Sequence, residues 1–228
     1  MKTLLRLVCF ALVCVATQSS DAAQMTLWYN GDPDLINGLA NELNTYVSDA
    51  RVYEDFDVPT PLTVCAVYSN NWMDFYASSA TWEIRSGVGP GTGGTLVASG
   101  SAIPTQTPNG FDVYGYTGFT IMVAGLNVDL SPGTYWLNVR PADSGVGRSF
   151  VQTTSGANGV GSPIQNNNSI IDSDFFGFSW QPSTSAGFEN QPDFSMGVLT
   201  VPEPSSLAIL SIGGGLLGLN LARRRRMR

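Results

Sequence analysis

Between positions 24 and 201, short runs of apolar, β-branched and aromatic residues alternate with clusters of Gly, Pro, Asn and Ser. Several runs show the period-2 pattern of a strand, in which successive side chains point to opposite faces. In the segment 80–85, Trp82 and Ile84 share one face and Glu83 and Arg85 share the other. The pattern predicts strands at 25–29, 51–58, 62–68, 80–85, 95–99, 119–123, 135–139, 149–153, 175–180 and 194–200.

Many short strands separated by turn signals predict an all-β domain, an antiparallel β-sandwich or jelly roll. The glycine-rich segment 87–94 is one such signal. It has neither the Lys-Ser/Thr ending nor the following helix of a phosphate-binding loop, so a hairpin loop is favoured. One helix is predicted at 32–43, where Asp32 would be the N-cap and Pro33 the first-turn residue, although Gly38 weakens it.

Residues 1–22 have the three parts of a secretory signal helix. Lys2 and Arg6 supply the positive start, an apolar run follows, and Ser20 and Ala22 place small residues at a cleavage site. The apolar run is shorter than the roughly 20 residues that span a bilayer. We therefore expect export, a mature chain that starts at Ala23, and a β-sandwich domain over 23–200.

The segment 201–228 combines a proline-containing linker, an apolar run at about 206–222 and a terminal cluster of arginines. Prolines cannot donate backbone hydrogen bonds, so the linker ends the last strand. The apolar run predicts a single transmembrane helix that anchors the chain in the membrane. Basic residues stay on the cytoplasmic side, which predicts a cytoplasmic tail formed by Arg223, Arg224, Arg225 and Arg226.

The order of Pro202-Glu203-Pro204, a short Gly-rich apolar helix and an arginine cluster resembles the PEP-CTERM sorting signal. The resemblance implies that an exosortase, a membrane cysteine transpeptidase-like enzyme, recognises the tail and cuts it near this motif. Pro202, Glu203 and Pro204 would then be the recognition residues of a substrate. It also implies a bacterium that makes exopolysaccharide, and a final location at the cell surface or in the extracellular matrix.

Short motifs in the predicted domain, such as Arg51-Val-Tyr-Glu-Asp-Phe56 and Asp193-Phe-Ser-Met-Gly197, look like those of the exported β-sandwich domains that often precede such signals. This second resemblance implies a fold and a location. It implies no activity.

The composition removes several kinds of chemistry. The chain has no histidine and its single lysine is Lys2, which excludes Ser-His-Asp, Cys-His and Ser-Lys catalysis and zinc sites with imidazole ligands. Cys9 and Cys14 lie in the signal, so Cys65 is left alone and is predicted to be a buried strand residue. Residues 23–200 hold four arginines against 16 acidic residues, a net charge of −12, which opposes nucleic-acid binding.

The sequence offers two kinds of site built from acidic residues. The dense carboxylates at 54–57 could serve a glycosidase, but a solvated strand face is favoured in so acidic a chain. Calcium takes oxygen ligands, and the candidates are Asp32 and Asp34, and Asp172 and Asp174 in the loop 166–174. Neither pair fits a known calcium loop, so polar turns are favoured and no cofactor is expected.

Aromatic side chains are the remaining candidates for ligand contact. Trp82 and Trp136 fall within predicted strands and are expected in the core, whereas Trp72 and Trp180 lie nearer loops and could stack on sugar rings. We therefore predict a non-enzymatic protein of the cell surface or matrix. The alternative is a carbohydrate-binding module for exopolysaccharide, assisted by calcium.

Overall fold

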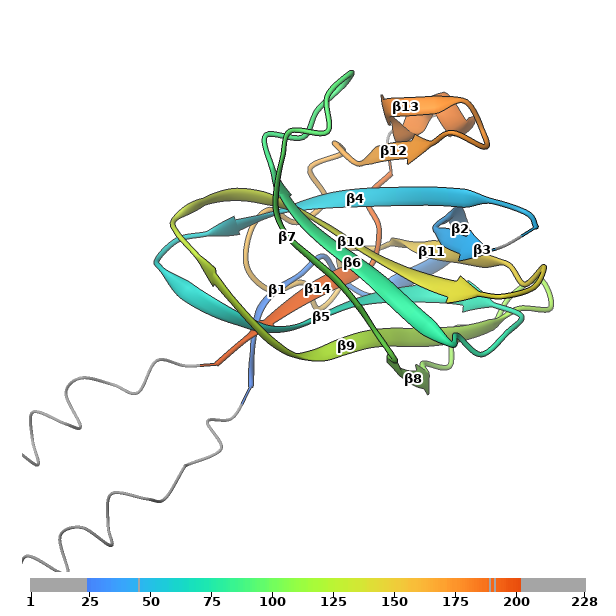
Figure 1. Cartoon of the computed structure of the whole chain (residues 1–228), viewed down its shortest axis with the longest axis horizontal. Coiled ribbons are helices and arrows are strands. Elements are labelled where there is room, and N and C mark those ends of the chain that lie inside the picture. Colours follow the sequence, from blue (N-terminus) through green and yellow to red (C-terminus); the bar gives the residue numbers. More distant parts are fainter. Residues whose placement is uncertain (1–23, 45, 189, 191, 202–228) are drawn as a thin grey trace, which may run out of the picture. The chain divides into compact units, whose positions relative to one another are not determined.

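The computed structural model describes residues 24–44, 46–188, 190 and 192–201, and these form two β-sheets packed face to face (Figure 1). The predicted all-β fold class is confirmed. The signal segment, the motif at 202–204, the predicted anchor helix and the terminal arginines lie outside the described residues. No helix in the described part of the chain is long and apolar enough to cross a membrane.

The first sheet is organised around β5. One edge of β5 pairs with β9, which in turn pairs with β8. The other edge is shared, because β14 pairs with the first half of β5 and β11 with the second; β1 and β2 then extend the sheet. Its strands are β1 (Met25–Tyr29), β2 (Pro33–Ala40), β5 (Leu62–Met73), β8 (Thr105–Pro108), β9 (Thr117–Leu130), β11 (Ser149–Thr154) and β14 (Met196–Thr200).

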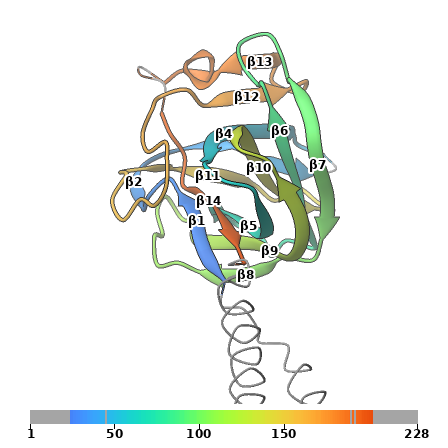
Figure 2. The ribbon, with the colours of Figure 1, turned by 90° about the vertical axis from the view of Figure 1, so that its left-hand side faces the viewer.

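The second sheet is antiparallel except for the parallel pair of β3 and β10. β12 and β13 extend it beyond β4 (Figure 2), and the short 3-10 helix η1 (Ser183–Ala186) follows β13. In spatial order its strands are β13 (Phe178–Pro182), β12 (Ile170–Ser173), β4 (Asp49–Val58), β3 (Glu42–Asn44), β10 (Gly133–Asp143), β6 (Ser79–Ser86) and β7 (Thr95–Ala102).

The core lies between the two sheets and is built by alternating positions on each strand. Trp82 and Ile84 of β6 point into it, as the sequence pattern predicted, and Leu137 and Val139 of β10 join them. Trp136 is also buried, but it belongs to a small second cluster on the opposite face of the second sheet. Cys65 is buried in β5, so its predicted place in a strand is confirmed.

The predicted helix at 32–43 is wrong, because the segment forms β2 and β3 instead. Asp32, the predicted N-cap, accepts hydrogen bonds from the side chains of Tyr29 and Asn158 instead, and the carboxylate of Asp34 accepts the backbone N–H of Ile36 within β2. Leu39 and Ala40 then pair with β11. Gly38 is a poor helix former, and its backbone lies so close to Trp72 that a Cβ would sit 3.1 Å from the indole. Pairing with distant strands therefore overrides the local capping signal.

Two further boundaries differ from the sequence prediction. The strand predicted at 175–180 begins only at Phe178, because Phe175, Phe176 and Gly177 form the turn between β12 and β13. The short strands β8 and β12 were not predicted. β8 pairs only four residues with the next strand, β9, and β12 pairs three residues with β4, far along the chain.

A substitution at Gly94 tests the predicted hairpin loop between β6 and β7. Gly94 has a left-handed φ of +58°, and a Cβ there would clash with the backbone carbonyl of Ser86. We expect Gly94→Ala to lower the free energy of unfolding by at least about 1 kcal/mol, because strain and collision add. Gly89→Ala is the matched control in the same loop, since its Cβ would meet nothing within 4 Å. Urea denaturation checks both, and equal stabilities would contradict the hairpin geometry.

Candidate functional site

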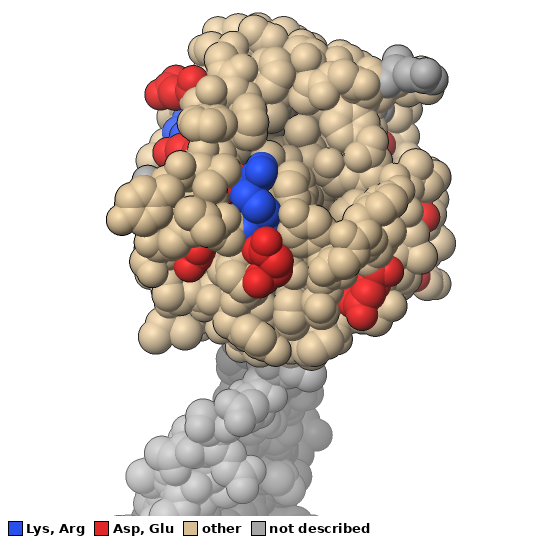
Figure 3. Space-filling model, turned by 90° about the vertical axis from the view of Figure 1, so that its right-hand side faces the viewer, with Lys and Arg blue, Asp and Glu red and all other residues tan. Residues whose placement is uncertain are grey.

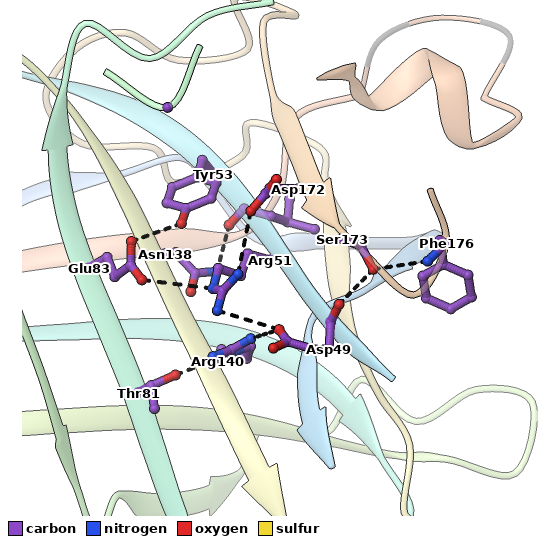
Figure 4. Close-up of polar contacts among 12 residues, drawn as sticks. Asp49, Arg51, Tyr53, Thr81, Glu83, Asn138, Arg140, Asp172, Ser173 and Phe176 are labelled. Carbon is purple, nitrogen blue, oxygen red and sulfur yellow. Dashed lines mark hydrogen bonds and ion pairs between the residues drawn. The ribbon is translucent and has the colours of Figure 1, made fainter. Parts of the chain in front are cut away.

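Charged side chains gather on the outer face of the second sheet, where β12 pairs with β4 (Figure 4). The guanidinium of Arg51 lies 3.4 Å from Asp172 of β12, 3.8 Å from Glu83 of β6 and 3.6 Å from Asp49. One cation thus connects three carboxylates from three strands. Asp172, a calcium candidate from the sequence, has a protein cation as its partner.

Arg140 of β10 extends this network toward the interior. Its side chain is only 5% exposed; it forms an ion pair with Asp49, and its Nε donates to Thr81 (3.2 Å). Burial and the neighbouring Arg51 lower the pKa of Arg140, whereas the Asp49 carboxylate stabilises the charge. The network therefore ties β4, β6, β10 and β12 together, which is a structural role.

Trp180 lies at the edge of this network and is partly buried. Its ring is 5.1 Å from that of Tyr53, and the guanidinium of Arg85 lies 5.0 Å above it. Gly93 of the β6–β7 loop also packs directly against the indole. Much of the Trp180 indole, the candidate surface for stacking on sugar rings, is therefore covered by protein.

Trp72 does not lie at the surface, so this part of the prediction is wrong. It is 4% exposed, and its indole N–H donates to the carbonyl of Phe111 at 2.7 Å. β5 continues through Trp72 to Met73, rather than ending in a loop, and β2 packs over the ring. The two tryptophans sit on different sheets and form no common platform.

The other calcium candidates each have their own surroundings. Asp32 accepts hydrogen bonds from Tyr29 (2.9 Å) and Asn158 (2.6 Å), whereas Asp34 accepts one from Thr153 (2.6 Å). Asp174 is exposed in the turn after β12. Within the described ranges, no group of three or more His, Cys, Asp or Glu side chains is arranged to hold a metal ion. That these acids form polar turns and hold no cofactor stays a prediction.

Two carboxylates predicted to face solvent are buried instead. Glu54 shares the inner face of β4 with Phe56 and is fully buried, and Asp55 is 7% exposed. The Oε1 atom of Glu54 accepts the backbone N–H of Phe194 (2.7 Å), next to the buried Asp193. Glu54 therefore cannot reach a substrate, because no part of its side chain is open to solvent.

The polar loop 166–168 supplies hydrogen-bond donors to these acids. Asn166 donates to Asp55 at 3.0 Å, and the backbone N–H of Asn167 donates to Asp193 at 3.1 Å. Burial raises the pKa of Glu54, Asp55 and Asp193. Repulsion from a nearby carboxylate raises each pKa further, from Asp193 and Asp55 on Glu54, from Asp57 on Asp55 and from Asp55 on Asp193. The hydrogen bonds lower the pKa of these three carboxyls, but burial raises it by more.

A pocket of 420 Å³ opens between β2, β11 and the β12–β13 turn. Its floor contains the buried Leu39 and Ile171, and its rim includes Arg148. Figure 3 shows the end of the domain that lies at the right of Figure 1, where the surface is hollowed and charged side chains are sparse. The aromatic residues that line the pocket are Phe150, Phe176, Phe178 and Phe188.

Sequence reasoning did not identify this pocket. Its lining comes from three segments, 37–40, 148–150 and 171–188, of which the first lies more than a hundred positions before the others, and only folding brings them together. One signal was available, the run of aromatic residues at 175–180, in which Phe175 and Phe176 are 60% and 40% exposed. Exposed aromatic residues in a turn are typical of binding surfaces.

Comparison with known protein families finds one match, to the PEP-CTERM protein-sorting motif at residues 200–226. The chain carries a PEP-CTERM sorting signal. This signal marks the protein as exported, directed to the surface and subject to exosortase processing. No curated protein and no solved structure matches the chain. The matched segment begins at Thr200, where β14 ends, so the sorting signal starts at the last residue of the last described strand.

The buried acids predict an unusual dependence of stability on pH. A carboxyl whose pKa is raised in the folded state favours folding when protonated, and this contribution is lost as pH rises above its unfolded value of about 4.5. We expect the free energy of unfolding to fall between pH 5 and pH 8. In Glu54→Gln this fall should shrink by about 1–3 kcal/mol. Denaturant titrations at several pH values measure it.

Glu83 provides a control of opposite sign. Burial alone would raise its pKa, but hydrogen bonds from Arg85 and Tyr53 and the nearby arginines lower it overall. Its contribution is present above the unfolded pKa and lost as pH falls. Glu83→Gln should therefore lose stability at pH 7 and approach the wild type near pH 3. Parallel pH profiles for the wild type and both variants would contradict the assignment.

Proposed function

We propose that this protein is a non-enzymatic component of the cell surface or extracellular matrix, released to its site after exosortase acts on the C-terminal tail. The sorting signal at 200–226 carries this proposal. The first 22 residues support export, because they combine a positive start, an apolar run and a small-residue cleavage site.

The junction between domain and tail supports removal of the tail. β14 pairs on one side with β5 and on the other with β1, and both pairings include Thr200. A cut near Pro202 to Pro204 would leave every residue of β14 in place. The sheet would keep its hydrogen bonds, so the released domain would stay folded.

Three features of the domain favour a binding or structural role over catalysis. The chain has no histidine, Glu54 is sealed in the interior, and the charged side chains around Arg51 are engaged with one another. These groups stabilise the fold, and none of them is presented to a substrate.

Carbohydrate binding is the second candidate function, and one observation favours it. The pocket between β2, β11 and the β12–β13 turn has aromatic walls, a polar rim and a volume within the range of about 300–1,000 Å³ typical of small-molecule sites. An exported surface protein with such a pocket would hold a glycan of the matrix. This proposal no longer depends on Trp72.

Intact-mass analysis of protein recovered from the outer surface tests the tail proposal. We expect a mass that begins near Ala23 and ends between Pro202 and Pro204. A variant with Pro202, Glu203 and Pro204 all changed to Ala should keep its tail and stay with the membrane fraction. Asp174→Ala, an exposed acid outside the motif, is the control and should be processed normally. Full-length tail on surface-exposed protein would overturn the proposal in favour of a plain membrane anchor.

A further inference from the structure

The aromatic walls of the pocket are held rigidly by neighbouring side chains. Phe188 packs edge-on against the buried Phe194, with ring centroids 6.1 Å apart. Phe150 packs in the same way against Tyr116 at 5.4 Å. Rings fixed in this manner lose little side-chain entropy when a ligand stacks on them, so the pocket is preorganised for a flat, partly apolar partner.

Arg148 is fixed at the rim by two contacts. Its Nε donates to the carboxylate of Glu42 at 2.8 Å, and its guanidinium lies 4.9 Å above the ring of Phe150. Glu42 is itself fully buried and accepts hydrogen bonds from Ser48 and the backbone N–H of Ser149. The two terminal nitrogens of Arg148 make no hydrogen bond with the described residues, which leaves a positioned set of donors at the pocket mouth.

The polar rim indicates a ligand rich in hydrogen-bond acceptors. Asn37, an exposed residue of β2, also lines the pocket and adds the N–H donors of its side-chain amide. A purely apolar ligand would leave these donors without partners when it covered them, and unpaired buried donors are costly. The ligand must therefore combine an apolar face for the phenylalanines with oxygen atoms at its edge.

The charges favour a neutral ligand over an anion. Arg148 is the one charged side chain among the described lining residues, and Glu42 compensates it. Residues 23–200 carry a net charge of −12, so an acidic polymer would be repelled as it approached. A sugar ring meets both requirements, because its C–H groups form an apolar face and its hydroxyl oxygens surround that face.

We propose that this pocket binds one or two units of a neutral saccharide, with the ring faces on Phe150 and Phe176 and the hydroxyls on Arg148 and Asn37. The proposal rests on the second candidate function above and assigns it a site and a ligand class. It is independent of tail processing, which the intact-mass experiment measures separately.

Calorimetric titration of the full chain tests the site, in a detergent without a sugar headgroup. The probes are neutral tetrasaccharides of glucose, galactose and mannose, a hexuronic-acid tetrasaccharide, and an apolar naphthalene dye. We expect at least one neutral tetrasaccharide to bind more tightly than the uronic-acid probe. Phe176→Ala should weaken this binding about tenfold, as truncation of a central contact does.

Two variants make the test specific to the pocket. Ile103→Ala is the control, because Ile103 follows β7, is an apolar side chain that is 84% exposed and does not line the pocket; the affinity of this variant should stay within about twofold of the wild type. Arg148→Lys keeps the positive charge toward Glu42 but loses the planar fork, so it should also weaken binding. Thermal melts establish that each variant is folded.

Three outcomes would overturn the inference. If both Phe176→Ala and Arg148→Lys bind the neutral saccharide as tightly as the wild type, the protein binds carbohydrate at a site other than this pocket. Tighter binding of the uronic-acid probe, or binding of the dye alone, would refute the ligand class. No binding of any neutral tetrasaccharide would refute both the site and the carbohydrate function.

Discussion

Burial of both faces of β4 is the constraint on which the second sheet depends. On the inner face, Val52 and Phe56 belong to the core between the sheets. On the outer face, Tyr53 is fully buried beneath Trp180 of β13. Because the strand is covered on both sides, the Arg51 side chain is only 27% exposed, and carboxylates of β12 and β6 compensate its charge.

The same constraint explains how Glu54 and Asp55 are accommodated. No arginine contributes to lowering the pKa of either carboxyl; the compensating groups are backbone N–H donors and the asparagine amides of the loop 166–168. Neutral donors stabilise a buried carboxylate only partly. The second sheet thus combines two kinds of buried charge, a few residues apart on β4. The charge of Arg51 is compensated by carboxylates, whereas those of Glu54 and Asp55 are compensated only in part.

The domain and the tail differ in whether their function depends on the folded structure. The sorting signal is a linear order of prolines, apolar residues and arginines that starts where β14 ends. The aromatic pocket, by contrast, needs β2, β11 and the β12–β13 turn in their folded positions. Removal of the tail, as we propose, would leave the strands in place, whereas the aromatic pocket exists only in the folded domain.

The sequence by itself determined the features that depend on neighbouring residues. Alternation placed Trp82 and Ile84 on the face that packs in the core, turn chemistry located the β6–β7 hairpin, and the order of the last segments identified the sorting signal. Only the tertiary structure decided the rest. Residues 33–44 became strands because β11 and β4 offered backbone partners, and Trp72 and Glu54 were buried by elements distant in sequence. The pocket likewise joins residues that no local pattern links. Hydrogen-bond pairing and burial are long-range, so local propensity and composition could not predict them.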